Sequence, residues 1–503
     1  MLAKVFTGAI IGLEAELIEV ETDIGKGRPV FFMVGLAAKE VEESKDRIKA
    51  ALLNTDFELP KHRITVNLAP ANIRKQGSSY DLPIALGILM ADGQLEADVS
   101  RAVVAGELSL SGQLRPIRGA LSLAIMAKSK GYQELFLPAK NAGEASLIKG
   151  IDIYAVCSLN QLINHLRKKN PMSPCQSTAI QSDPGQYELD LADIKGHSTA
   201  KRALEIAAAG GHNILFSGPP GSGKTMLART MPSILPPLTT AEIIEVTQIY
   251  SITGLLSADV PYISQRPFRK PHHTSSSAAL VGGGNIPSPG EISLAHRGVL
   301  FLDEFPEYSR YALESLRQPL EDGKITVSRV SGTLEFPAQF ILVAAMNPCP
   351  CGYATDTDKE CLCNPYQIIN YQKKISGPLL DRIDIHLEVP RLNFEKLNTV
   401  GEVESSRAVR RRVEQIRLLQ ERRFADSPTL TNSEMSTGEI ARFCTLDDQG
   451  TAIIRHAVNK LNLSPRSYHR LLKISRTIAD LDKQKDIQSH HLTECLQYRL
   501  RVE

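Results

Sequence analysis

A glycine-rich loop stands between a strand-like and a helix-like segment, and this junction constrains the fold of the chain more than any other feature. The loop consists of Gly218, Pro219, Pro220, Gly221, Ser222, Gly223, Lys224 and Thr225. Residues 213–217 before it are mostly apolar, and residues 226–229 after it are typical of a helix. The glycines let backbone N–H groups face phosphate oxygens, Lys224 reaches the β- and γ-phosphates, and the Thr225 hydroxyl is a ligand for Mg²⁺. The loop therefore predicts a nucleoside triphosphate site.

Polar side chains follow two further segments that have the pattern of buried parallel strands. Residues 298–302 lead directly into Asp303 and Glu304. Carboxylates at the end of a buried strand need a positive partner or a chemical role, so we expect Asp303 to bind Mg²⁺ and Glu304 to polarise the attacking water. Residues 340–346 end at Asn347. We expect the Asn347 side chain to orient that water beside the γ-phosphate.

These motifs, together with Ser-Gly-Pro-Leu-Leu-Asp-Arg-Ile-Asp at residues 376–384, resemble an AAA+ ATPase. In that superfamily an arginine finger completes the site of the neighbouring subunit, so the resemblance implies that Arg382 acts across the interfaces of a ring. Arg466, at the start of a predicted helix, resembles the sensor-2 arginine of magnesium chelatases and replicative helicases, which closes the lid onto ATP. The resemblance implies ATP and Mg²⁺ as cofactors and a catalytic set comprising Lys224, Glu304, Asn347, Arg382 and Arg466.

Three longer segments, residues 267–274, 289–296 and 347–352, resemble the ComM/YifB group of magnesium-chelatase-like proteins. The match extends over almost the whole chain. It implies a homo-hexameric, ATP-driven DNA translocase or helicase that acts on single-stranded or branched DNA. The implied role is to promote branch migration during natural transformation and recombination.

Length and charge are compatible with this interpretation. The chain has 503 residues, enough for two or three domains, and a net charge of +2. Contact with DNA must therefore come from local basic patches and not from the overall field. No apolar run is long enough to cross a bilayer, and the first residues lack the pattern of a signal peptide. We expect a cytoplasmic protein without a membrane partner.

The chain is expected to be an α/β protein with three structured parts. A polar, proline-containing stretch without periodicity predicts a linker. The expected parts are an N-terminal α+β domain at 1–168, the linker at 169–186, an AAA+ P-loop core at 187–395 with a cysteine-rich insertion at 347–365, and a helical lid domain at 396–503.

Two basic segments of the core are candidates for DNA contact. Residues 325–336 alternate apolar and polar side chains on both sides of a turn, which predicts a β-hairpin. In the helicase branch such a hairpin points into the central pore, where Lys324 and Arg329 would meet a threaded strand; the alternative is an edge hairpin without function. In the segment 268–284, Arg269 and Lys270 suit contact with backbone phosphates.

Two more patterns in the core leave alternatives open. In the same segment, the adjacent His272 and His273 project differently in any regular element, so structural or DNA contact is favoured over metal binding. Residues 407–423 are rich in arginine and predict an amphipathic helix, with a solvated charged face favoured over DNA contact.

Four of the eight cysteines form two close pairs, Cys349 with Cys351 and Cys361 with Cys363. Two such pairs separated by a polar loop are able to place four thiolates around one Zn²⁺, although the Cys-x-Cys spacing is shorter than the usual Cys-x₂-Cys. Structural zinc is the favoured interpretation. Disulfides are the main alternative, but a cytoplasmic ATPase would keep them reduced, which leaves free thiols and redox chemistry as the other interpretations.

The N-terminal part, through residues 74–85, 104–108 and 114–119, resembles the proteolytic domain of Lon, which has a ribosomal S5-like fold. The resemblance places Ser79 at the nucleophile, but Leu121 stands where the dyad needs a lysine. A serine without an adjacent base is a weak nucleophile, so we expect the fold without the proteolytic activity. Two alternatives to the DNA motor stay open: an ATP-dependent protease, which Leu121 disfavours, and a chelatase subunit, which shares the ATPase branch but not the Lon-like domain or the cysteine pairs.

Overall fold

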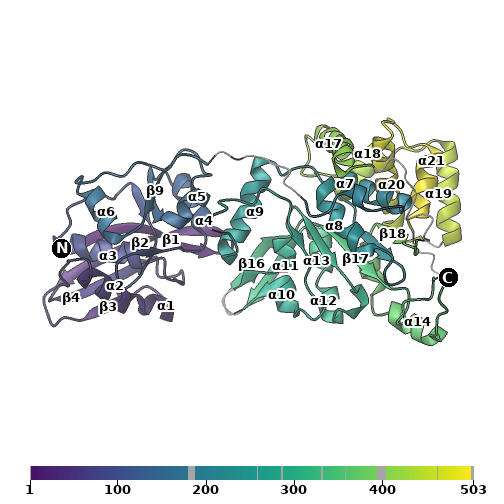
Figure 1. Cartoon of the computed structure of the whole chain (residues 1–503). Coiled ribbons are helices and arrows are strands. Elements are labelled where there is room, and N and C mark those ends of the chain that lie inside the picture. The colour runs from purple at the N-terminus through teal and green to yellow at the C-terminus, as the bar shows by residue number, and fades with distance from the viewer. Residues whose placement is uncertain are drawn as a thin grey trace. The chain divides into compact units, whose positions relative to one another are not determined.

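The chain folds into two compact units, which Figure 1 colours by residue number. The first comprises Met1–Gln181 and Thr239–Ile263, and the second comprises Ser182–Leu238 and Ser264–Glu503. Among the residues described, no helix is long and apolar enough to span a membrane. The computed structural model describes residues 2–178, 180, 187–257, 259–284, 287–329, 332–356, 358–392, 404–461 and 463–499.

A seven-stranded mixed sheet forms the centre of the first unit, with the order β3-β4-β2-β1-β5-β8-β9. The pairs β1–β2 and β2–β4 are antiparallel, and the remaining neighbours are parallel. Because side chains alternate along a strand, Val5, Val20 and Val66 all reach the buried core. The strands are β1 (Leu2–Ile11), β2 (Glu14–Gly25), β3 (Phe31–Val34), β4 (Arg63–Ala69), β5 (Ala102–Val104), β8 (Glu134–Pro138) and β9 (Asp152–Val156), with a separate antiparallel pair β6 (Glu107–Leu108) and β7 (Leu114–Arg115).

Helices cover this sheet, and the most apolar of them, α3, packs against β1 and β2 and is buried along nearly its whole length. Helix α9 begins at a capping box formed by Thr239 and Glu242 and ends at Gly254, whose φ is 75°. The helices are α1 (Lys39–Glu42), α2 (Ser44–Leu53), α3 (Asp81–Ala91), α4 (Ala120–Ser129), α5 (Ala139–Ala145), α6 (Leu159–Leu166) and α9 (Thr240–Thr253).

The position of α9 differs from the expected division of the chain. Residues 239–263 fall inside the expected ATPase core, but they lie in the first unit, where α9 packs against α4. Gln248 fixes this contact, since its Nε2 donates to the carbonyl of Leu13 at 2.6 Å and to Ser122 Oγ at 3.2 Å. The expected linker and the start of the expected lid lie partly outside the described residues.

The residues of the Lon-like resemblance lie in the first unit. Leu121 is fully buried in α4. The Ser79 carbonyl accepts a hydrogen bond from the Gly106 N–H at 2.9 Å. The neighbouring hydroxyl of Ser78 donates to the carboxylate of Glu107. Within the described residues no hydrogen bond joins the Ser79 hydroxyl to a lysine, and the assignment of an inactive protease domain stays a prediction.

A five-stranded, all-parallel sheet forms the centre of the second unit, with the order β11-β14-β17-β10-β18. Continuous apolar strands are typical of a sheet that is covered on both faces, and Phe216, Phe301 and Val343 are fully buried. This sheet confirms the expected α/β core. The strands are β11 (Phe268–Arg269), β14 (Val299–Leu302), β17 (Ile341–Met346), β10 (Ile214–Ser217) and β18 (Ile385–Glu388), with the separate pairs β12 (Gly282–Gly283) and β13 (Ser288–Pro289), and β15 (Lys324–Arg329) and β16 (Gly332–Pro337).

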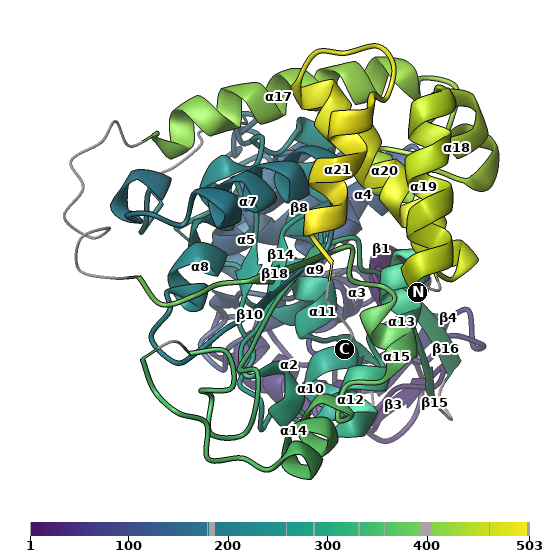
Figure 2. The same ribbon diagram turned by 90° about the vertical axis from the view of Figure 1, so that its right-hand side faces the viewer.

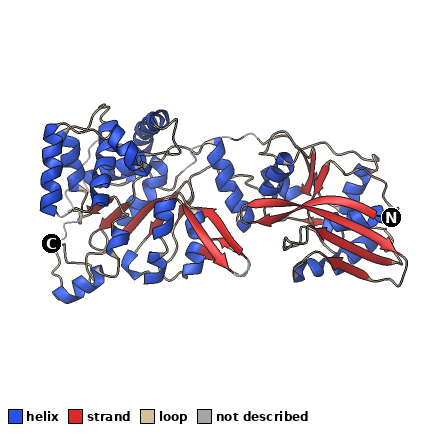
Figure 3. Cartoon of the chain, turned by 180° about the vertical axis from the view of Figure 1, so that it is seen from behind, coloured by secondary structure: helices blue, strands red, loops and turns tan. Residues whose placement is uncertain are grey.

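Helices flank this sheet, and its C-terminal helices group together, as Figures 2 and 3 show. The helices are α7 (Ser198–Gly210), α8 (Lys224–Ile234), α10 (Ser277–Val281), α11 (Glu291–Leu294), α12 (Arg310–Glu314), α13 (Arg317–Asp322), α14 (Pro365–Gln372), α15 (Gly377–Leu380), α17 (Ser406–Arg423), α18 (Thr437–Phe443), α19 (Asp448–Leu461), α20 (Pro465–Leu481) and α21 (Ser489–Gln497), with short 3₁₀ turns at Leu191–Asp193, Phe305–Glu307 and Asn432–Glu434.

The arginine-rich helix α17 is confirmed, but its charged face is not simply solvated. Val409, Val413 and Ile416 are buried in the core that the sheet shares with α7 and α8. Arg410 donates to the carbonyl of Ser233 at 2.6 Å, and Arg417 donates to the carbonyl of Ala208 at 2.8 Å. The arginines therefore attach α17 to the ends of α7 and α8.

A buried carboxylate organises the C-terminal helices. Asp480 on α20 accepts from Arg423 at 2.5 and 2.7 Å, from Arg476 at 3.1 Å and from Asn432 at 2.8 Å. The side chains of Asp480 and Arg476 are 1% and 2% exposed. Two cations are thus held among the C-terminal helices by a single anion.

We expect Asp480→Asn to destabilise the second unit, because it leaves two buried guanidinium groups without a counter-charge. Breaking a buried ion pair from one side costs about 3–5 kcal/mol, which corresponds to a fall of roughly 10 °C in the thermal midpoint of a unit this size. Scanning fluorimetry measures the midpoint. Asp486→Asn, at an exposed carboxylate after the same helix, serves as the control and should change it little; equal midpoints for both variants would contradict the role of Asp480.

Candidate active site

The glycine-rich loop leaves the carboxyl end of β10 and enters α8, as the sequence predicts. A Cβ added to Gly218 would lie 2.2 Å from the carbonyl oxygen of Val389, so no other residue fits there without moving the neighbouring chain. Gly221 and Gly223 have φ values of 77° and 87°, which L-residues rarely adopt. The loop therefore curls over the strand end and leaves the N-terminus of α8 facing the space where phosphates bind.

Lys224 connects the loop to the neighbouring strand. Its ammonium donates to the carbonyls of Gly218 and Pro219 at 2.6 and 2.8 Å, and lies 3.4 Å from Asn347 Oδ1. Lys224 is 9% exposed. Burial lowers its pKa to about 8, and the charge of Asp303 opposes part of this shift. The structure thus brings Lys224 and Asn347 together, as the motifs predict.

Asp303 and Thr225 lie side by side. The Thr225 hydroxyl donates to Asp303 Oδ2 at 3.2 Å, and the ammonium of Lys270 donates to the same oxygen at 3.0 Å. A hydroxyl and a carboxylate at this spacing suit one Mg²⁺, whose ligands are oxygens. Lys270, expected to contact DNA, is placed at this carboxylate.

Glu304 has a histidine partner that sequence reasoning did not identify. Its Oε2 lies 3.0 Å from His273 Nδ1, and its backbone φ of 50° turns the residue out of the strand direction. The adjacent His272 instead contacts the Thr274 hydroxyl at 2.8 Å. The two histidines thus project differently, as expected, and only one of them faces the carboxylate that would activate water. The histidine pair is evident in the sequence. Its contact with Glu304 was not predictable, because the two segments are far apart along the chain.

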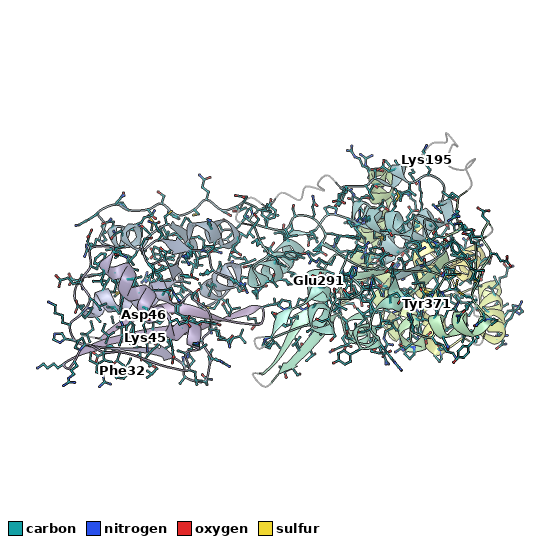
Figure 4. The ribbon with its side chains drawn as sticks, turned by 60° about the horizontal axis from the view of Figure 1, so that its bottom comes forward. Phe32, Lys45, Asp46, Lys195, Glu291 and Tyr371 are labelled. Atoms are coloured by element: carbon teal, nitrogen blue, oxygen red, sulfur yellow. The ribbon has the colours of Figure 1, made fainter. Side chains whose placement is uncertain are left out.

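Arg269 also has a local partner. Its guanidinium forms a bidentate ion pair with Glu291, which Figure 4 labels, with both distances 2.7 Å. Arg269 ends the edge strand β11 and Lys270 follows it, so the strand places Lys270 beside the end of β14. DNA contact by Arg269 and Lys270 stays a prediction.

The two arginines of the AAA+ resemblance lie away from the phosphate loop of their own chain. The Arg382 carbonyl accepts from Asn213, which precedes β10, whereas the loop leaves the other end of that strand. Four strand residues span about 13 Å. Arg466 lies with Arg382, since both donate to Glu321, at 2.6 and 2.5 Å. The structure therefore brings the arginines to each other and not to Lys224.

The predicted hairpin is confirmed as β15 and β16, paired from Lys324 with Pro337 to Arg329 with Gly332. Figure 2 labels its two strands. Lys324 is exposed and lies 3.4 Å from Glu335 on the opposite strand. The side chain of Arg329 and the turn at 330–331 lie outside the described residues.

The four cysteines of the insertion converge. Their sulfurs all lie within 4.8 Å of one another, with Cys349 at 3.4 Å from Cys351 and 3.7 Å from Cys361. A tetrahedral Zn–S₄ site with bonds near 2.3 Å has sulfurs about 3.8 Å apart, so the spacing fits zinc. A second candidate group, Asp482 with His490 and His491, shares its carboxylate with Arg202.

The thiol cluster adjoins the nucleotide site. A Cβ on Gly352 would lie 2.7 Å from Cδ of the Pro220 ring, so the backbone of the insertion packs directly on the loop there. Arg391 donates to the Pro220 carbonyl at 3.4 Å and lies 3.8 Å from Asp356 of the insertion. Tyr371 of α14, labelled in Figure 4, interacts with the main chain of Asn347. The insertion, which begins at Asn347, thus touches the loop through Gly352, and Tyr371 just after it contacts the main chain of Asn347.

Comparisons with known proteins agree with this geometry. Family models match three stretches of the chain: "Magnesium chelatase, subunit ChlI" over residues 190–397, "Subunit ChlI of Mg-chelatase" over 20–141, and "Magnesium chelatase, subunit ChlI C-terminal" over 403–499. The chain is 46% identical to the Competence protein ComM of Haemophilus influenzae, over 100% of this chain and 98% of that protein. It is 42% identical to the uncharacterized protein YifB of Escherichia coli, over 99% of this chain and 97% of that protein, and 42% identical to the uncharacterized protein Rv2897c of Mycobacterium tuberculosis, over 95% of both.

The chain belongs to the ComM/YifB family. Its magnesium-chelatase-like AAA+ core indicates ATPase activity with ATP and Mg²⁺ as cofactors. In this ComM/YifB protein, protonation of Lys224 offers a test of the ATP site. Its pKa is lowered to about 8, so part of the side chain is deprotonated at mildly alkaline pH.

We expect ATP to raise the Lys224 pKa, because the phosphates stabilise the ammonium. Binding at about pH 8.5 should therefore take up a fraction of a proton, and affinity should fall as the pH rises above 8. Calorimetry in buffers of different ionisation enthalpy measures the uptake. Lys224→Arg, which stays charged, is the control and should take up none; wild-type protein that binds ATP without proton uptake would contradict the lowered pKa.

Proposed function

We propose that this protein is a cytoplasmic, homo-hexameric AAA+ ATPase that moves along single-stranded or branched DNA and promotes branch migration in natural transformation and recombination. The observation that carries the proposal is the combination, in one unit, of an ATP site with a hairpin that bears the exposed Lys324. The similarity to a protein named as a competence protein supports a DNA-related role.

The residues have separate roles in this proposal. Lys224 and the loop hold the phosphates, and Asp303 with Thr225 holds Mg²⁺, which neutralises charge on the transferred phosphoryl group. Glu304, held by His273, polarises the attacking water, and Asn347 orients it. Arg382 and Arg466 serve the site of the neighbouring subunit, because they lie at the opposite end of β10 from their own loop.

Two other functions are supported less well. An ATP-dependent protease needs a base for Ser79, and buried Leu121 supplies none. A chelatase subunit shares the ATPase unit. The N-terminal part does not separate this alternative from the DNA motor, contrary to the sequence-based argument, because residues 20–141 match a chelatase-subunit model. The thiol cluster and the response to DNA remain as discriminating features.

ATP hydrolysis with and without DNA tests the proposed function. We expect single-stranded or four-way-junction DNA to raise the rate more than duplex DNA does. Lys224→Ala should lose nucleotide binding, whereas Glu304→Gln should bind ATP and hydrolyse it at least ~100-fold more slowly, because it loses the base that activates water. Fluorescent ATP binding and phosphate release measure the two effects. A rate that no DNA changes, or equal loss of binding in both variants, would contradict the proposal.

We also infer that the thiol cluster binds one structural Zn²⁺, which holds the insertion against Pro220 of the loop. The near-tetrahedral sulfur spacing and the contact between Gly352 and the loop support this inference. A bound Zn²⁺ would offset the repulsion between four thiolates at this spacing. Zinc would thus fix the position of the phosphate loop relative to Asn347.

Metal analysis of the purified protein should find about one Zn per chain, and the double variant Cys361→Ser, Cys363→Ser should lose it. ATP affinity should also weaken in this variant, because the insertion no longer supports Pro220. Cys157→Ser, at an exposed cysteine elsewhere in the chain, is the control. A metal-free wild-type protein with four titratable thiols in the insertion would end the zinc inference.

A further inference from the structure

One carboxylate receives both arginines that the AAA+ resemblance assigns to the ATP site. Arg382 Nη2 and Arg466 Nη2 both donate to Glu321 Oε1, at 2.5 and 2.6 Å. The Arg382 side chain is 7% exposed, whereas those of Glu321 and Arg466 are 41% and 54% exposed. The pKa of Glu321 is lowered, and the largest cause is the hydrogen bond that it accepts from Arg382. The carboxylate is therefore charged at neutral pH and binds both guanidinium groups.

This contact competes with the role proposed for Arg382. A guanidinium bound to a carboxylate has fewer donors left for phosphate, and a carboxylate beside a triphosphate repels it. Arg382 also donates through Nη1 to the Pro378 carbonyl at 2.6 Å, and its buried Nε has no partner in the described part of the chain. A change at Glu321 would free the Nη2 donor and leave the Nη1 contact in place.

Glu321 is joined directly to the hairpin. It lies in the last turn of α13, and Gly323, with a φ of 64°, leads from that helix into β15 at Lys324. The hairpin returns to the same point, because the Ala338 N–H donates to the Gly323 carbonyl at 2.8 Å. The two strands are thus closed at the end of α13. Only Asp322 and Gly323 separate Glu321 from Lys324, so a displacement of the hairpin is transmitted directly to Glu321.

We propose that Glu321 is a positioning residue that holds Arg382 and Arg466 back from the neighbouring subunit's ATP until DNA moves the hairpin. The inference rests on the proposed function, since it needs both a DNA-responsive hairpin and arginines that act between subunits. When the hairpin shifts, α13 carries the carboxylate away, and both guanidinium groups become available to phosphate. DNA binding and hydrolysis are then coupled through one side chain.

ATP hydrolysis by the full-length protein, with and without single-stranded DNA, tests the coupling. Glu321→Gln keeps the shape of the side chain but loses the charge, so we expect DNA-free hydrolysis to rise roughly fivefold, the upper range for a partly exposed ion pair. The stimulation by DNA should fall toward one. A residue that only supported the fold would lower both rates instead. Asp322→Asn, at the adjacent exposed carboxylate, is the matched control and should behave like wild type.

The double variant Glu321→Gln, Arg382→Ala should lose the raised DNA-free rate, because the rise acts through Arg382. If wild type responds to DNA but Glu321→Gln keeps the same ratio of stimulated to basal rate, the role of Glu321 is overturned and the DNA motor stands. If DNA does not change the wild-type rate, the motor and the coupling both fail. A raised basal rate that survives loss of Arg382 would also overturn the proposal.

Discussion

The buried ammonium of Lys224 is the interaction on which the arrangement of the active site depends. It is held by the first two carbonyls of the glycine-rich loop, which follows β10, and lies near Asn347, which follows β17. The charge of Asp303, which follows β14, also acts on it. A parallel sheet brings these three strand ends to one edge, but the strands alone do not fix the side chains. A single cation in a poorly solvated site attracts an oxygen or a carboxylate from each of them.

Strand β10 also sets the distance between two functional ends of the unit. Its carboxyl end leads to the phosphate loop, and the residue before its amino end contacts Arg382. If Arg382 acts on a neighbouring subunit, as proposed, each subunit presents an ATP-binding half-site and a catalytic half-site at opposite ends of β10. Under that proposal, a site is completed only when a second copy joins head to tail, and repetition of that contact closes into a ring if the rotation allows it.

Local sequence was sufficient for much of this structure and insufficient for the rest, for a physical reason. The loop, Asp303, Asn347 and the hairpin were predictable because each depends on neighbouring residues or on the end of a strand. The ion pair of Arg269 with Glu291, and the contacts of Lys270 with Asp303 and His273 with Glu304, join residues 22 to 33 positions apart. Such pairs are set by the order of strands in the sheet, which a single sequence does not state.

The positions of Arg466 and α9 were likewise not predictable from local sequence. Ser464 and Pro465 predict the start of the helix that carries Arg466, but the place of Arg466 beside Arg382 depends on how the C-terminal helices pack on the sheet. Residues 239–263 have the pattern of a normal helix and loop, and nothing local shows that α9 packs with the first unit.

The placement of α9 means that the polypeptide passes between the two units three times, after residues 181, 238 and 263. The first unit is therefore completed only after part of the second has been synthesised, so the two cannot fold strictly one after the other on the ribosome. A shortened protein that lacks residues 1–168 would also keep α9 without its support, with Ile243, Val246 and Ile249 deprived of a buried setting. The two units therefore cannot be exchanged separately between proteins by joining sequences near residue 170, because α9 would be parted from the rest of its unit.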